Sequence, residues 1–175
     1  MRTLIMALGL FSVISASAQN DSIYFHNGKT VEGNVVRVAE FTVVYKYAGE
    51  DAEQTVGKYA INKIIYGKSH RTEQFSEKVA VLSKEDWEKV VILEDKSQVA
   101  GLTKVDAVKG KTALINYRTA AGSSAKAEKD LKQKAAELGC MFVLMVSDKD
   151  ADLSGSEGRG LGGTQSMKSG VAYKY

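Results

Sequence analysis

The sequence predicts an α+β protein in which a small five-stranded β barrel, residues 19–67, precedes a β-β-α-β-β two-layer sandwich, residues 87–175. Three observations lead to this expectation. Short segments of alternating apolar residues fill the first half, helix-forming residues fill 125–138, and an unbroken apolar run begins at Met141. Apolar residues make up 44% of the 175-residue chain, which is ordinary for a globular core.

The first half has the pattern of five consecutive short strands. The segments SIYFH and TVEGNVVRV flank Asn27-Gly28, a strong hairpin signal because both residues tolerate positive φ. The segments FTVVYKY, TVGKYA and KIIYG follow, with apolar or aromatic residues at alternating positions. We expect these strands to form a small closed or nearly closed barrel, which removes exposed strand edges.

Three motifs of this half resemble those of a known small domain. They are D-x-I-x-x-x-N-G-x-x-V-x-G-x-V from Asp21 to Val35, Tyr45-Lys46, and Ile61-x-x-Ile64-Ile65-Tyr66. The segment resembles the small SH3/Sm-like β domain common in exported proteins of Bacteroidetes. The resemblance implies an SH3-like barrel. It implies no activity, since small barrels host unrelated functions.

The second half has a different spacing of apolar residues. Residues 68–86 lack a clean period and are hydrophilic at both ends, so we expect a connector that packs on a neighbouring element. The segments EKVVILED and LTKVDAVKG then predict two strands. Later in the chain, MFVLMVS predicts a strand that is covered on both faces and central in its sheet. A loop over 148–169 and a final strand, GVAYKY, complete the sandwich.

A helix is predicted from Ala125 to Leu138, before the buried strand. Its apolar positions recur at three- and four-residue steps on one stripe, at Ala127, Leu131, Ala135 and Leu138. Two pairs with the acid four residues before the base support its polar face, namely Glu128 with Lys132 and Asp130 with Lys134. Gly139 is placed to end the helix in the left-handed conformation.

The segment from Trp87 to Tyr175 also has a family resemblance, through A-A-E-L-G-C-M-F-V at 135–143 and G-V-A-Y-K at 170–174. It resembles the fold of YbjQ-like proteins and of the C-terminal domain of the Rcs-pathway outer-membrane sensor lipoprotein. A helix that ends in A-x-x-L-G-A and enters a buried strand is the hallmark of that fold, and Cys140 takes the alanine position. The chain has neither a lipidation cysteine nor paired cysteines, so membrane tethering and disulfides are not implied.

Cys140 is the only cysteine in the sequence. It follows the expected helix end and begins the expected buried strand, where a small apolar side chain fits. A reactive thiol needs a polarising histidine or lysine beside it, and neither histidine is near in sequence. We therefore interpret Cys140 as a packing residue.

The first eighteen residues, MRTLIMALGLFSVISASA, have the pattern of a cleaved signal peptide. Arg2 precedes an apolar run from Leu4 to Ile14, and Ala16-Ser17-Ala18 places the cleavage before Gln19. The apolar run is too short to span a bilayer, so we expect no transmembrane anchor and a periplasmic or secreted protein. The interspersed net charge of +3 favours neither nucleic acid nor anionic membrane as a partner.

One set of motifs matches serine acyl-enzymes in order. Ser123-x-x-Lys126, Ser147-Asp148-Lys149 and Lys168-Ser169-Gly170 correspond to S-x-x-K, S-D-N and K-T-G. The second motif differs at its third residue, and 45 positions from Ser123 to Lys168 are too few for the helical domain of those enzymes. Ser123 or Ser124 as a helix N-cap explains the position without chemistry. We expect no enzyme, and a small hydrolase using Ser123 and Lys126 is the alternative.

Cofactor and metal motifs are poorly supported. Residues 158–163 are formally G-x-G-x-x-G, but no helix is expected after them, so we expect a glycine-rich loop in which Arg159 contacts a partner. Asp148 to Asp152 lack EF-hand spacing, and His26 and His70 lie in different elements. No cofactor or metal is predicted. A ligand or metal carrier that uses the 148–169 loop is a second alternative.

Aromatic residues are concentrated in the first half, at Tyr24, Phe25, Phe41, Tyr45, Tyr47, Tyr59 and Tyr66. A small barrel cannot bury all of them, and those left on a face would form a recognition surface. The predicted binding residues are Tyr45, Tyr47 and Tyr59, together with Arg159. The sequence thus predicts a non-catalytic exported binding module of the cell envelope, in stress sensing or surface maintenance, with an envelope protein or peptide as its partner.

Overall fold

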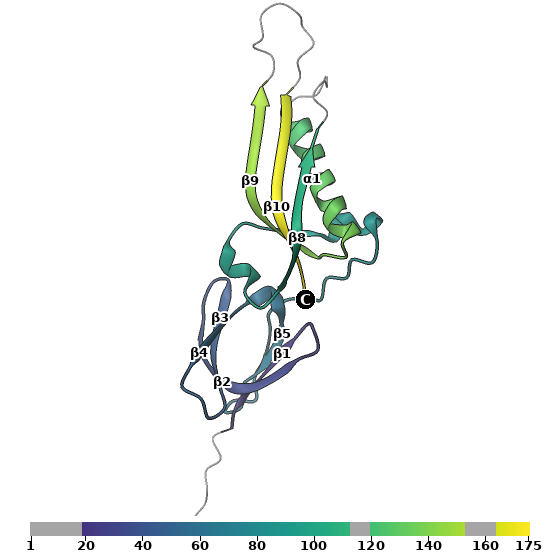
Figure 1. Ribbon diagram of the computed structural model, residues 1–175. Coiled ribbons are helices and arrows are strands. Elements are labelled where there is room, and N and C mark those ends of the chain that lie inside the picture. The colour runs from purple at the N-terminus through teal and green to yellow at the C-terminus, as the bar shows by residue number, and fades with distance from the viewer. Residues whose placement is uncertain (1–18, 113–119, 153–163) are drawn as a thin grey trace, which may run out of the picture.

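The computed structural model describes residues 19–112, 120–152 and 164–175. It contains two β sheets and one long α-helix, so the protein is α+β as predicted. Figure 1 shows the two sheets end to end, the six-stranded sheet below and the four-stranded sheet above. No helix in the described ranges has the length and apolar composition that crossing a bilayer requires. The predicted signal peptide, residues 1–18, lies outside the described residues.

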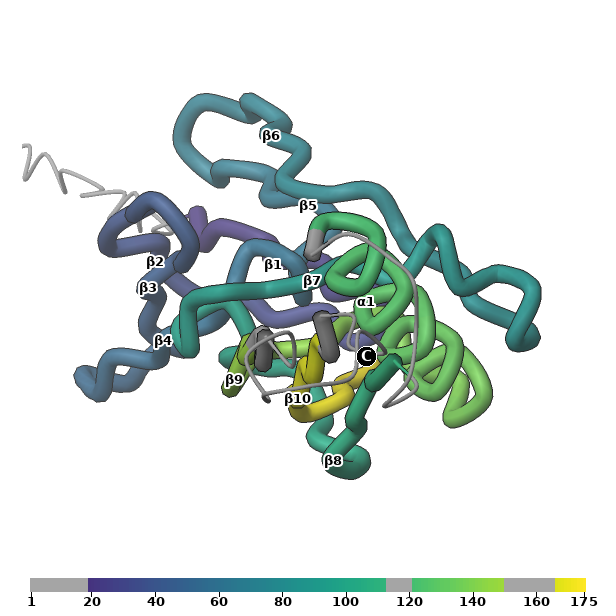
Figure 2. The backbone as a smooth tube through the Cα atoms, turned by 90° about the horizontal axis from the view of Figure 1, so that it is seen from above, coloured from purple at the N-terminus to yellow at the C-terminus, as the bar shows by residue number. Residues whose placement is uncertain are grey.

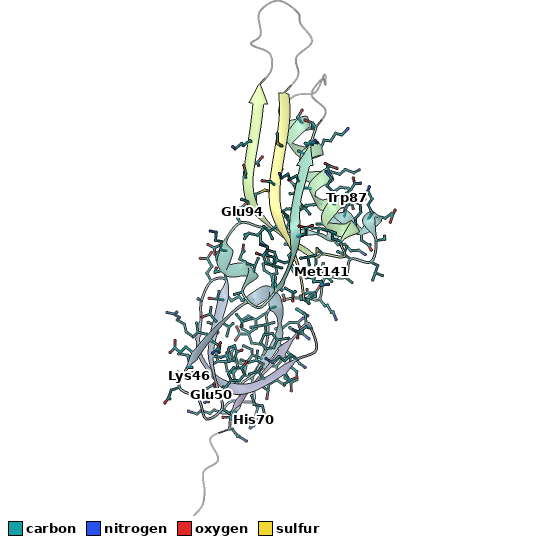
Figure 3. The ribbon with its side chains drawn as sticks, in the orientation of Figure 1. Lys46, Glu50, His70, Trp87, Glu94 and Met141 are labelled. Carbon is teal, nitrogen blue, oxygen red and sulfur yellow. The ribbon has the colours of Figure 1, made fainter. Side chains whose placement is uncertain are left out.

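The six-stranded sheet consists of β1 (Asp21–Phe25), β2 (Thr30–Val38), β3 (Thr42–Tyr47), β4 (Glu53–Gly57), β5 (Ile61–Ile65) and β6 (Thr72–Gln74). Its strand order is β4-β3-β2-β1-β5-β6, and every neighbouring pair is antiparallel. The predicted hairpin at Asn27-Gly28 joins β1 to β2, with Gly28 at a φ of 89°. Figure 3 shows Lys46, Glu50 and His70 at the end of this sheet farthest from the other sheet.

The six-stranded sheet does not close into a barrel, so the predicted five-stranded SH3-like barrel is not confirmed for the described residues. The sheet has six strands, and β4 and β6 are its two ends and do not pair with each other. The additional strand, β6, lies within residues 68–86 and pairs with β5, Lys63 opposite Gln74. It occupies the edge of β5 that would have to meet β4 for the barrel to close. The segment expected to be a connector is therefore in part a strand.

The four-stranded sheet consists of β7 (Val91–Leu93), β8 (Thr103–Lys111), β9 (Phe142–Asp152) and β10 (Thr164–Lys174), with the helix α1 (Ala120–Glu137) between β8 and β9 in sequence. Its order is β7-β9-β10-β8, with β7 parallel to β9 and the other pairs antiparallel. The chain order is β-β-α-β-β, as the sequence predicted. Three short 3-10 helices lie between the strands, η1 (Lys58–Ala60), η2 (Lys84–Lys89) and η3 (Lys96–Val99).

Helix α1 packs three of the four residues of its predicted apolar stripe on the four-stranded sheet, whereas the fourth, Leu138, follows the helix and is 43% exposed. Ala127, Leu131 and Ala135 are fully buried, and a Cβ added to Gly110 of β8 would collide with the Ala127 carbonyl oxygen. The two predicted ion pairs are also present, Lys132 Nζ to Glu128 Oε1 at 3.3 Å and Lys134 Nζ to Asp130 Oδ2 at 2.9 Å. The described helix starts at Ala120, earlier than predicted, so Ser123 lies inside it and is not its N-cap.

The end of α1 explains the position of Cys140. Gly139 has a φ of 64°, its N–H donates to the Ala136 carbonyl, and the Cys140 N–H donates to the Ala135 carbonyl, both at 2.9 Å. These two bonds form a Schellman motif, in which the residue after the glycine contacts the last turn of the helix. Cys140 is fully buried beside Ala135, as predicted for a packing residue. Burial also raises the pKa of its thiol, which keeps the thiol protonated and unreactive.

Strand β9 is an inner strand, as its apolar run predicted. Val143 packs toward α1, while Phe142 and Leu144 pack on the opposite face, so both faces are covered at this end of the strand. The loop predicted over 148–169 is wrong at both ends, because β9 continues to Asp152 and β10 already begins at Thr164. Pairing with β10, including Lys168 opposite Asp148, keeps this polar segment extended.

Strand β8 is an edge strand whose outward backbone groups meet side chains. The Lys111 N–H donates to Asp130 Oδ2 at 3.1 Å, and Lys134 Nζ donates to the Lys109 carbonyl at 2.6 Å. Both side chains come from α1. Helix and edge strand are thus joined by polar contacts in addition to the apolar stripe.

The two sheets meet through a third apolar cluster, here called the junction cluster. Its buried members are Leu93, Phe142 and Leu144, and the partly buried side chains around them include Tyr59, Val99, Leu102, Tyr173 and Tyr175. The Tyr59 and Tyr175 rings lie 5.5 and 5.3 Å from the Phe142 ring, centroid to centroid. The Val79 N–H also donates to the Tyr175 hydroxyl at 3.0 Å. Side chains from both halves of the chain therefore build the contact between the sheets.

Candidate functional site

A hollow of about 210 Å³ lies beside the junction cluster and is the candidate site, here called the junction pocket. It is lined by Glu40, Phe41, Lys58, Tyr59, Phe75, Ser76 and Gln98. These residues come from the β2–β3 turn, from η1, from the chain after β6, and from η3. Only Gln98 comes from the second half of the chain, so this half completes one wall of the pocket.

Local hydrogen bonds fix the elements around the junction pocket. The Lys58 N–H donates to the Phe41 carbonyl at 2.8 Å, which holds η1 against the β2–β3 turn. The Gly57 N–H donates to the Ala100 carbonyl, also at 2.8 Å, and brings η3 to the same place. Glycine is required here because a Cβ at position 57 would collide with the Gln98 carbonyl oxygen. The approach of η3 to η1 thus depends on one missing side chain.

The walls of the junction pocket are aromatic and its rim is charged. Phe41, Tyr59 and Phe75 are each half-buried, so part of every ring stays available to a ligand. The Lys58 ammonium lies 5.8 Å from the centroid of the Phe75 ring, within cation–π distance. Glu40 is exposed at the rim. Such a pocket suits an apolar or aromatic group that enters from solvent, with polar contacts at the opening.

At the pocket, the lining residue Ser76, which is half-buried, forms a polar pair with the buried His26. Ser76 Oγ lies 2.8 Å from His26 Nε2, 2.8 Å from the Ile61 carbonyl oxygen and 3.2 Å from the Lys58 carbonyl oxygen. A hydroxyl has one proton, so Ser76 donates to a carbonyl and accepts from the histidine. A serine whose proton is held by a carbonyl is not activated as a nucleophile. The pair positions η1 and β5.

His26 is held neutral by its surroundings. Burial lowers its pKa below the usual value, and the positive charge of Lys78 lowers the pKa further. Its ring packs against Tyr175 with 4.9 Å between centroids. His26 therefore links the six-stranded sheet to the last residue described in the four-stranded sheet.

The structure brings one predicted binding residue, Tyr59, into the junction pocket and places two others elsewhere. Tyr45 is only 5% exposed and belongs to the core of the six-stranded sheet, so its ring is not on a surface. Tyr47 is half-buried beside it and receives hydrogen bonds from Tyr45 at 3.5 Å and from Lys29 at 3.3 Å. These bonds lower the pKa of Tyr47, while burial raises the pKa of Tyr45. Arg159 lies outside the described residues.

The residues of the acyl-enzyme alternative have different environments. Ser123 is fully buried under α1, whereas Lys126 is exposed on its other side. Lys168 is also buried and forms an ion pair with Asp148, Nζ to Oδ2 at 2.6 Å. Residues 153–163, the centre of the loop in the carrier alternative, lie outside the described part. Among the described residues, no three His, Cys, Asp or Glu side chains are grouped as metal ligands.

The sequence did not reveal most of the pocket. Phe41 and Phe75 have no periodic pattern that marks them as a pair, and Gln98 belongs to a 3-10 helix that was not expected. Gly57 next to the tyrosine-containing η1 is the only local signal of a close approach between segments. Comparison of the chain with protein-family models, with curated proteins and with solved structures finds no match. The two family resemblances therefore stay predictions.

Proposed function

We propose that this chain is a non-catalytic binding module of the cell envelope, which captures an apolar or aromatic side chain of an exported protein or peptide in the junction pocket. The observation that carries the proposal is the set of three half-buried rings around an open hollow, Phe41, Tyr59 and Phe75. A volume of about 210 Å³ is below the roughly 300–1,000 Å³ typical of small-molecule sites, which favours a single side chain.

The placement of polar groups supports binding over catalysis. In the serine–histidine pair at the pocket, His26 donates to Ser76 and Ser76 donates to a backbone carbonyl, an arrangement that activates no nucleophile. Export to the periplasm or beyond is part of the proposal, and its support is the signal-peptide pattern of residues 1–18.

The test is selection of peptides from a random display library against residues 19–175, followed by affinity measurement for the enriched peptides. We expect the peptides to share one large apolar or aromatic anchor. Phe41→Ala should weaken binding about tenfold or more, because truncating an anchor contact commonly costs that much. Phe41 belongs to none of the three core clusters, so this variant is expected to fold.

Tyr24→Ala is the matched control. Like Phe41, Tyr24 is half-buried and lies outside the three core clusters. The Lys63 ammonium lies 5.1 Å from its ring centroid, an environment similar to that of Phe75 beside Lys58. Its truncation should leave the affinity within about twofold. Enriched peptides without a common anchor, or equal losses in the two variants, would refute the proposed role of the pocket.

A further inference from the structure

The four-stranded sheet has one face under α1 and a second face that points away from it. Figure 2 shows α1 on one side of β8, β9 and β10. Side chains alternate between the faces, so the buried residues Val108 and Gly110 of β8 and Lys168 of β10 mark the helix side. Their neighbours in sequence on β8 and β10 point to the other side, where Lys149 of β9 lies opposite Met167. Val146 is the extra residue of the β9 bulge beside them. We call the outward side chains of Val146, Met167, Val171, Lys109, Lys111 and Lys149 the open face.

The centre of the open face is apolar. Val146 is 67% exposed and Met167 is 47% exposed, and Val171 is half-buried two positions along β10 from Ser169. A sheet that is solvated on one face normally has polar residues there. Large apolar side chains in its middle strand are the pattern of a contact surface. This apolar centre lies along β10 and beside the bulge of β9 opposite Ser169 and Gly170.

Both sides of this centre are basic. In the strand register, Met167 lies opposite Lys111 of β8 and opposite Lys149 of β9, and Lys109 follows along β8. Within the described residues, none of these three lysines takes part in an ion pair. The nearby carboxylate of Asp148 is bonded to the buried Lys168 on the helix side. The open face therefore has unpaired positive charge on both sides of an apolar stripe.

We propose that the open face binds an acidic amphipathic helix of a partner protein. Neighbouring strands are about 4.8 Å apart, so lysines on β8 and β9 stand about 10 Å apart across β10. This separation is close to the diameter of an α-helix. A helix laid along β10 would place its apolar stripe on Val171 and Met167 and the carboxylates on its two sides beside the lysines.

The charge pattern of the open face favours an acidic helix over a second copy of the chain and over an anionic lipid surface. A second copy of the chain, docked through the same face, would oppose lysine to lysine, and such like-charge contacts are unfavourable. An anionic lipid surface would gain only about 1 kcal/mol per lysine, and the face has no tryptophan or tyrosine anchor at its apolar centre. An acidic helix satisfies both the apolar centre and the lysines.

The test uses residues 19–175 and two 18-residue model helices with the same leucine stripe, one flanked by glutamates and one by lysines. Binding is followed by peptide fluorescence anisotropy. We expect the glutamate helix to bind, the lysine helix not to bind, and 0.5 M salt to weaken binding at least tenfold. In the double variant Lys111→Glu/Lys149→Glu, the preference for the two helices should reverse.

Lys46→Glu/Lys63→Glu is the matched control, since both lysines lie on the six-stranded sheet. It should leave binding unchanged, as should Phe41→Ala, which separates this surface from the junction pocket. Equal binding of the two helices, or equal weakening by the control, would overturn the proposal. So would sedimentation with phosphatidylglycerol vesicles in the absence of helix binding.

Discussion

The outward face of the four-stranded sheet has two halves with opposite environments. Near the six-stranded sheet, Phe142 and Leu144 of β9 are buried in the junction cluster. Two residues beyond Leu144, Val146 is 67% exposed, although the strand is still apolar at that position. The difference shows that apolar residues make a strand suitable for burial. Whether their side chains are buried depends on another element packing against them. The half with Phe142 and Leu144 is covered by the six-stranded sheet through the junction cluster, and the other half is the open face.

The largest loss of stability should come from a substitution in the buried half of this face. We expect Phe142→Ala to lower the free energy of unfolding by about 3–5 kcal/mol, because it removes a fully buried ring and leaves a cavity between the sheets. Urea unfolding followed by far-UV circular dichroism and by the fluorescence of Trp87, the only tryptophan, measures the change. A loss below about 1 kcal/mol would show that the junction cluster does not hold the sheets together.

A smaller effect should come from the backbone approach that builds the junction. Gly57→Ala places a methyl group against the Gln98 carbonyl, so η3 has to move away from η1. We expect a loss of about 1–3 kcal/mol in urea unfolding, typical of overpacking. Thr55→Ala, an exposed position in the same strand, is the control and should be nearly neutral. Equal losses in both variants would contradict the tight contact.

Acid should lower the stability of the protein through protonation of His26. Because burial lowers the pKa of this histidine in the folded protein, the unfolded chain binds the proton first as the pH falls. The free energy of unfolding should therefore decrease below about pH 6.5, the usual histidine pKa, and be unaffected by this residue above it. Thermal unfolding from pH 8 to pH 5 measures the dependence.

His26→Gln should flatten this pH dependence, whereas His70→Asn should preserve it. His70 is the only other histidine, it is exposed, and its φ of 54° suits asparagine. An unchanged pH profile in His26→Gln would assign the acid sensitivity to other groups.

The smallest effect should come from the open face. Met167→Ala removes a side chain that is 47% exposed, so we expect the free energy of unfolding to change by about 0.5 kcal/mol or less. The expected change is much smaller than that of Phe142→Ala, although both residues lie on the same face of the sheet. A loss above about 1.5 kcal/mol would mean that Met167 is already packed in the isolated protein.

The elements that the sequence predicted correctly depend on local patterns. The stripe of α1, its two ion pairs, the glycine at its end and the burial of Cys140 all follow from residues within five positions of one another. The β-β-α-β-β order and the central place of β9 follow from the same kind of pattern.

The features that the sequence missed depend on partners far away in the chain. The short β6 exists through its pairing with β5, and the polar end of β9 is extended because Lys168 of β10 pairs with Asp148. The junction pocket joins Phe41 to Gln98 and could not be found by periodicity. Tyr45 was expected on a surface because aromatic pattern alone does not tell which ring a small core encloses.

The contacts of Asp130 and Lys134 with the backbone of β8 have a consequence for colloidal behaviour. An uncovered edge strand recruits strands from other molecules, and that is a route to amyloid-like aggregation. Here side chains of α1 already occupy the Lys111 N–H and the Lys109 carbonyl. At this end of β8, pairing with another strand therefore requires prior detachment of the helix, so conditions that loosen α1 should shorten the lag time for fibril formation.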